Sequence, residues 1–200
     1  MKHLHRPDLY GWAAFDTVRD VDFNGVLWVR PEGNVLIDPM PLSAHDAEHL
    51  ERLGGAALIV LTNSDHTRAA ADIAHHAGAR ILGPAGERDS FPLPCQRWLG
   101  EGDEVVPGLS VLALHGSKTP GELALLLEGT TLITGDLVRA HRAGSLMMLP
   151  DAKLADVEAA RASVRRLAAL ADAEAVLVGD GWPVFRGGHT LLQELVATLG

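Results

Sequence analysis

Several polar side chains stand directly after predicted strands, where they could bind a metal ion or carry acid–base chemistry. They are Asp65 and His66 after residues 56–62, His115 and Lys118 after residues 109–114, Asp136 after residues 130–134, and Asp180 after residues 175–178. Functional groups often lie in loops on a rigid sheet. Carboxylates and imidazoles that converge in one pocket suit a hard or borderline divalent cation. The sequence therefore indicates a candidate site at one end of a sheet.

The elements that must position these residues alternate between strands and helices. Predicted strands cover residues 26–30, 35–38, 56–62, 80–82, 109–115, 123–128, 130–134 and 175–178. Helices are expected over residues 43–53, with Ser43 as the N-cap, and over 67–77, 151–171 and 190–199. Residues 83–107 have prolines at positions 84, 92 and 94 and little periodicity, which predicts a long loop. This order predicts packed sheets with helices outside them, in one domain over residues 1–200.

Five segments, in order, resemble motifs of the metallo-β-lactamase superfamily, especially its small glyoxalase II-like members. Residues 34–38 look like the strand before the family's first helix, 61–66 like its T-H-x-H-x-D-H loop, 117–125 like G-H-T-P-G-S, 132–136 like the T-G-D strand end, and 178–181 like the final G-H-G. The resemblance implies an α/β (α+β) fold, a four-layer αββα sandwich, with a metal site at the strand ends. Hydrolysis of a small ester, thioester or lactone is the implied activity.

The metal ligands of the family are largely replaced in this chain, and the first loop can be aligned in two registers. Anchoring on residues 61–62 puts Asn63, Asp65, Thr67 and Arg68 at the four ligand positions, which leaves no complete site. Anchoring on the following helix places Asp65 and His66 on the D-H pair and implies a deletion of about two residues. The second register is preferred because it keeps the length of that helix.

In the preferred register the resemblance implies one surviving metal position. The histidines of the first metal are missing, and Lys118 stands at the third of them. The second metal would keep Asp65, His66 and Asp136, with Asp180 in place of the last histidine. This set could hold one Zn, Fe or Mn ion, and the ammonium of Lys118 could replace part of the charge of the lost metal.

The same residues have an alternative interpretation, in which Lys118 and the aspartates form a buried ion-pair cluster and no metal is bound. Two functions therefore stay open. One is a hydrolase in which Asp136 orients a metal-activated water while Lys118 or His115 stabilises the oxyanion or protonates the leaving group. The other is a non-catalytic protein that binds a small ligand or partner in a metal-free pocket. In either case Arg68 and Trp182 are candidates for contacts with the small molecule.

Composition narrows the classes of partner. The formal net charge is −9 and no Lys/Arg cluster occurs, so we expect no binding to nucleic acid or to an anionic membrane. The longest apolar runs are too short to cross a bilayer, and the first ten residues lack the apolar core of a signal peptide. Cys95 is the single cysteine, which suggests a reducing compartment, so a cytoplasmic protein is expected. The composition is also compatible with a homodimer.

Overall fold

The computed structural model describes all of residues 1–200 and contains two large sheets. The first has the strand order β1-β2-β3-β4-β5-β6-β7, with bounds Lys2–His3, Leu9–Asp16, Val21–Trp28, Val35–Ile37, Leu58–Val60, Arg80–Pro84 and Arg97–Leu99. The second has the order β14-β11-β10-β9-β8, with bounds Ala175–Val178, Thr131–Thr134, Leu123–Leu127, Leu109–Ala113 and Glu104–Val106. A separate ribbon pairs β12 (Val138–Arg139) with β13 (Met147–Met148).

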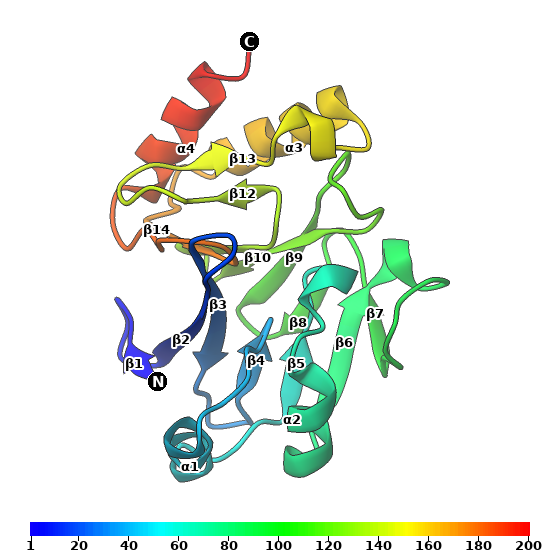
Figure 1. The fold of residues 1–200 in the computed structure, drawn as a ribbon, viewed down its shortest axis with the longest axis vertical. Coiled ribbons are helices and arrows are strands. Elements are labelled where there is room, and N and C mark those ends of the chain that lie inside the picture. Colours follow the sequence, from blue (N-terminus) through cyan, green and yellow to red (C-terminus); the bar gives the residue numbers. More distant parts are fainter.

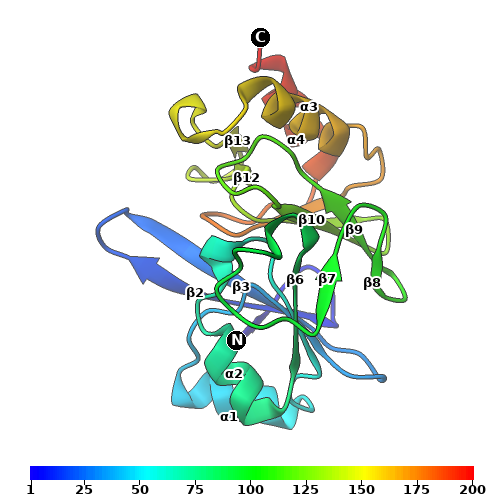
Figure 2. The ribbon, with the colours of Figure 1, turned by 90° about the vertical axis from the view of Figure 1, so that its right-hand side faces the viewer.

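Helices cover the outer face of each sheet, so the molecule has four layers (Figure 1, Figure 2). The seven-stranded sheet is covered by α1 (Ala44–Arg52) and α2 (Ala70–Ala77), and the five-stranded sheet by α3 (Val157–Ala168) and α4 (Gly188–Ala197). The predicted αββα sandwich is confirmed. None of these helices has the length and apolar character needed to span a membrane.

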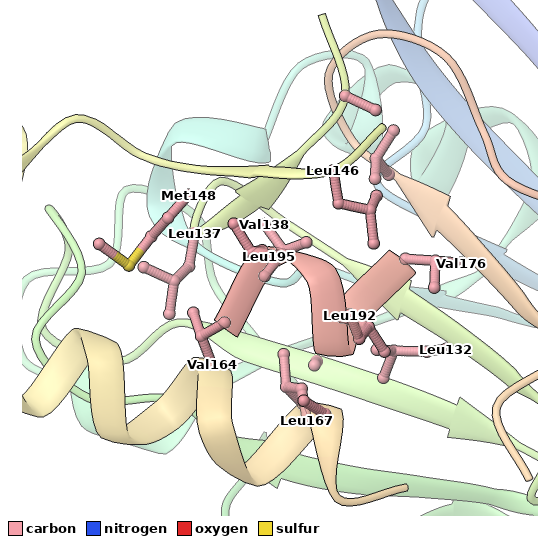
Figure 3. Close-up of a cluster of buried hydrophobic side chains, with 14 of the residues drawn as sticks. Leu132, Leu137, Val138, Leu146, Met148, Val164, Leu167, Val176, Leu192 and Leu195 are labelled. Carbon is pink, nitrogen blue, oxygen red and sulfur yellow. The ribbon is translucent and has the colours of Figure 1, made fainter. Parts of the chain in front are cut away.

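The central strands are buried on both faces, which explains why they are continuous apolar runs in the sequence. In β4, Val35 and Ile37 pack between the two sheets, whereas Leu36 packs toward α1 and α2. In β11, Ile133 points between the sheets and Leu132 points toward α3 and α4. Figure 3 shows the core between the five-stranded sheet and its helices, where side chains of α3 and α4 meet those of β11 and β14.

Local signals placed several helix boundaries correctly. Ser43 caps α1, because its side chain accepts a hydrogen bond from the backbone N–H of Asp46. Gly78 ends α2 in the left-handed conformation. The helix predicted over residues 151–171 is shorter than expected: a 3-10 turn covers Asp151–Lys153, and α3 begins only after the N-cap Asp156.

Other expectations for the fold were wrong. The predicted loop over residues 83–107 contains β7 and β8, which are only three residues long and therefore carry almost no periodic signal. The strand β2 was missed because its glycine and two alanines have low strand propensity, yet it pairs with β3 along its whole length. The helix expected from residue 67 begins at Ala70, so Arg68 lies before it and has a positive φ of 35°.

Candidate functional site

Four strands deliver polar residues to the same end of the sandwich. β4 is parallel to β5 and β11 is parallel to β14, so the carboxyl ends of each pair lie together. Asp38 follows β4, the segment 62–66 follows β5, Asp136 follows β11 and Asp180 follows β14. Asp65, His66, Asp136 and Asp180 line a pocket of about 650 Å³, and Asp38 contacts His66. The structure thus brings together Asp65, His66, Asp136 and Asp180 from three of the predicted strand ends.

His66 is held in the site by Asp38. The 3-10 turn Ser64–His66 follows the N-cap Asn63 and buries the imidazole. Its Nδ1 lies 2.7 Å from Asp38 Oδ2, which also accepts a 2.6 Å hydrogen bond from the hydroxyl of Thr62. Burial lowers the pKa of His66, but the carboxylates of Asp38 and Asp136 outweigh it and raise the pKa to about 9. The ring is therefore a buried imidazolium at neutral pH.

Asp136 lies at the centre of the charged cluster, and both of its carboxylate oxygens have cationic partners. Oδ1 accepts a 2.8 Å hydrogen bond from Arg139, and Oδ2 lies 2.9 Å from the ammonium of Lys118. The side-chain amide of Asn63 donates to Oδ2 at 3.2 Å, and His66 Nε2 lies 3.7 Å from it. Burial raises the pKa of Asp136, but His66 and Lys118 hold it far below the ordinary value. Asp136 is therefore a fully compensated carboxylate.

Arg139 joins Asp136 to Asp180. Besides its bonds to Asp136, its guanidinium places Nη1 3.1 Å from Asp180 Oδ2. Asp180 Oδ1 lies 3.6 Å from Arg68 Nη2 and makes no hydrogen bond. The side chains of Arg139 and Asp180 are both almost fully buried. A planar guanidinium suits this bridge because it presents two parallel N–H donors at fixed spacing.

Lys118 reaches the cluster from the loop after β9. Its ammonium lies 2.7 Å from Asp65 and 2.9 Å from Asp136, so the two contacts expected for this lysine are both present. Burial lowers the pKa of Lys118, but the two carboxylates outweigh it and raise the pKa. Asp65 itself is 54 % exposed at the rim of the pocket. Lys118 is therefore charged and links the rim to the buried cluster.

Arg68 lines the same pocket but is largely occupied in holding the backbone together. Its Nη1 donates to the carbonyl oxygens of Asn24, at 2.8 Å, and Asp38, at 3.3 Å. The guanidinium also lies over the ring of Phe23, 5.4 Å from its centroid. Arg68 thus ties β3 to the end of β4 beside the site.

Another buried carboxylic acid, Glu122, lies next to the charged cluster. Glu122 accepts hydrogen bonds from the hydroxyl of Ser117 and from the backbone N–H of Leu137, which follows Asp136. Burial and the nearby charge of Asp136 raise the pKa of Glu122 to about 7. The residue fixes the loops that carry Lys118 and Asp136 relative to each other.

Two predicted site residues lie elsewhere. His115 is exposed, does not line the pocket, and uses its backbone N–H and C=O to bond the side chain of Ser163 in α3. Trp182 is also exposed and lines a different groove, next to Phe185. Both are close in sequence to site residues, but the loops turn their side chains away.

Two residues of the site were not identified from the sequence. Asp38 stands at a strand end, as the identified residues do, so its position was a usable signal. Arg139 lies three residues after Asp136 in β12, and its pairing with Asp180 depends on how β11 and β14 meet. No local pattern marks that contact.

Three of the four residues expected to bind metal offer ligand atoms close together. One ring nitrogen of His66 and one carboxylate oxygen each of Asp136 and Asp180 all lie within 4.8 Å of one another. Asp65 is not in this group. However, Lys118 and Arg139 already occupy the oxygens of Asp136, and Arg139 occupies one oxygen of Asp180. A divalent ion would have to displace these cations from the carboxylates, so the donor set does not fit a metal in this arrangement.

Comparisons with known proteins identify the family. A model described as the metallo-beta-lactamase superfamily matches residues 1–199, so the chain belongs to that superfamily. A metallo-beta-lactamase from Pontibacter korlensis is similar in structure, with a TM-score of 0.75 at 17 % identity over 97 % of this chain and 95 % of that one. One from Hirschia baltica has a TM-score of 0.72 at 15 % identity over 96 % and 92 %. These likenesses concern the fold. Among curated proteins, none matches the sequence significantly.

Proposed function

We propose that this member of the metallo-β-lactamase superfamily is a metal-free binding protein, whose pocket holds a small molecule beside an internal ion-pair network. The observation that carries the proposal is the ion pairing of the Asp136 carboxylate. Both of its oxygens are paired with cations of the chain itself, Lys118 on one side and Arg139 on the other. In this proposal the two side chains supply the positive charge that a metal would otherwise bring.

The charge balance of the cluster supports the same conclusion. The carboxylates are Asp38, Asp65, Asp136 and Asp180, and the cations are Lys118, Arg68, Arg139 and the imidazolium of His66. Apart from Glu122, whose pKa of about 7 leaves it partly protonated, four charges of each sign balance without any ion. An added divalent cation would leave buried positive charge uncompensated, or would have to release a buried guanidinium from its partners, and both are costly.

The pocket itself is suited to a small ligand. Its volume of about 650 Å³ lies in the range typical of small-molecule sites. It opens at the carboxyl ends of strands, where the loops carry polar groups on a rigid support. Lys118 and Arg68 lie in its wall, and in the proposed function these side chains contact the ligand.

A second candidate function is a hydrolase of a small ester, thioester or lactone that uses one Zn, Fe or Mn ion. The grouping of His66, Asp136 and Asp180 favours it, because these residues offer one imidazole and two carboxylates at close range. A bound metal would supply Lewis-acid activation of water and of the substrate's oxygen. This function requires that Lys118 and Arg139 leave the carboxylates.

Elemental analysis of the protein, purified without added metal or chelator, separates the two functions. The metal-free proposal predicts far less than one equivalent of Zn, Fe or Mn per chain. One equivalent that is lost in Asp136→Ala, and kept in the control Asp151→Ala on the exposed turn before α3, would overturn the proposal in favour of the hydrolase.

A further inference from the structure

The charged side chains of the pocket differ in how deeply they are buried. The carboxylates of Asp136 and Asp180 are only 3–5 % exposed, beneath the cations that pair with them. Lys118 is 30 % exposed and Arg19 is 69 % exposed, so their charged ends reach the pocket surface. Asp65 is the one exposed carboxylate in the lining. A molecule that enters the pocket therefore meets Lys118, Arg19 and one carboxylate, Asp65, while the other two carboxylates of the lining are buried.

Two exposed cations at the mouth of the pocket strengthen this asymmetry. Arg19, near the turn between β2 and β3, lies with its guanidinium 5.7 Å from the centroid of the Phe23 ring and pairs with Asp16, which does not line the pocket. The contact with Phe23 orders the arginine against the wall. Lys153, on the 3-10 turn Asp151–Lys153, is exposed and forms no ion pair. Lys153 therefore gives the mouth an unpaired positive charge, in a chain whose net charge is −9.

Apolar side chains complete the lining. Val21, Met40 and Leu149 lie in the wall but are buried, so Phe23, which is partly exposed, supplies its apolar surface. Such surface gains from contact with the carbon skeleton of a ligand, whereas a bare inorganic anion would leave it in contact with water.

From these observations we infer that the ligand of the pocket is a small organic anion, a carboxylate or a phosphate ester with an apolar group. This inference rests on the proposed function, because it takes the pocket to be free of metal. The acid group of the ligand would lie near Lys118, Arg19 and Lys153, and its apolar part would lie against Phe23. The buried carboxylates stay with their own partners and do not repel the ligand.

Calorimetric titration of the protein with phenyl phosphate, phenylacetate and phenylacetamide at constant ionic strength tests the inference. The two acids distinguish a phosphate from a carboxylate, and the amide is a neutral probe of similar shape. We expect at least one acid to bind one site per chain about tenfold or more tightly than the amide. Equal affinity for the amide, or no binding of either acid, would overturn the inference.

A charge-removing variant locates the binding. Arg19→Gln combined with Lys153→Gln should weaken binding of the acid about fivefold or more and leave binding of the amide unchanged. Arg186→Gln, at an exposed position outside the pocket, is the matched control and should bind like the wild type. Unchanged affinity for the acid in the double variant would contradict the placement of the anion at the mouth. Because the substituted residues are exposed, thermal unfolding should show an intact fold.

Measuring the metal content of the same preparation distinguishes a failure of the metal-free function from a failure of the ligand assignment. One metal ion per chain would refute the metal-free function, whatever the acids do. A metal-free protein that discriminates neither acid from the amide would refute only the assignment of the ligand as an anion.

Discussion

The two ends of the sandwich carry ion pairs of the same residue types in different surroundings. At the end opposite the pocket, Arg6 lies 2.8 Å from Asp8 and 2.8 Å from Glu128, and the side chain of Glu128 is 50 % exposed. At the pocket end, Arg139 lies 2.8 Å from Asp136 and 3.1 Å from Asp180, and all three side chains are 8 % exposed or less. The N–O distances of the two sets of ion pairs are alike, but the side chains at the pocket end are more deeply buried.

This difference in burial indicates which charged side chains the stability of the fold depends on. Water and salt screen the exposed pairs, so they contribute little to stability. The buried pairs lose their hydration, and each charge then depends on its partner to stay in place. In the buried cluster at the pocket end, removing one charged side chain therefore leaves its partner uncompensated, whereas we expect the opposite end to tolerate substitution.

The largest effect is expected for Arg139→Met. The change leaves Asp136 and Asp180 buried with fewer partners, at a cost of about 3–5 kcal/mol in the free energy of unfolding. Urea denaturation followed by circular dichroism measures this. Arg142→Met, three residues later at an exposed position, is the control and should cost less than about 0.5 kcal/mol. Similar losses in both variants would mean that burial does not govern the contribution of these arginines.

A second effect is a dependence of stability on pH. The pKa of His66 is raised from 6.5 to about 9 in the folded state, so the stabilisation is complete below about pH 6.5 and is lost as the pH rises through 9. The free energy of unfolding should fall by roughly 2–3 kcal/mol across this range. Chemical denaturation at a series of pH values gives the slope, and an NMR titration of the imidazole gives the pKa. A His66 pKa near 6.5 would show that Asp38 and Asp136 do not hold the proton.

A smaller loss is expected for Lys118→Met, since this side chain is partly exposed and Asp136 keeps Arg139 as a partner. The expected cost is about 1–3 kcal/mol. Lys153→Met, at the exposed mouth of the pocket, is the matched control and should leave stability almost unchanged. Equal behaviour of the two lysine variants would show that Lys118 points into solvent.

The smallest effect is expected at the opposite end. Arg6→Met breaks the pairs with Asp8 and Glu128, and it should cost about 1 kcal/mol or less because these groups remain hydrated. The loss should shrink further when unfolding is measured in 0.5–1 M salt, on the order of concentrations that screen exposed charges within a few ångström. A loss as large as that of Arg139→Met would remove the distinction between the two ends.

The sequence predicted the fold better than the site, for a physical reason. Buried runs such as residues 56–62 and the strand end at Asp136 leave local patterns that indicate strands and the edge where polar residues converge, and the resemblance to the metallo-β-lactamase superfamily implied the four-layer sandwich. The bridge made by Arg139 joins residues from two strands that are neighbours only in the folded chain. The directions of His115 and Trp182 depend on loop geometry, which residue types alone do not determine.

The central claim is that Lys118 and Arg139 take the place of a metal, and the melting temperature with and without added zinc tests it most directly. Wild-type protein should show no stabilisation by zinc, because both oxygens of Asp136 are already paired. Arg139→Met frees one carboxylate oxygen each of Asp136 and Asp180, which lie close to His66, so zinc should raise its melting temperature. Strong stabilisation of the wild type by one equivalent of zinc would contradict the account.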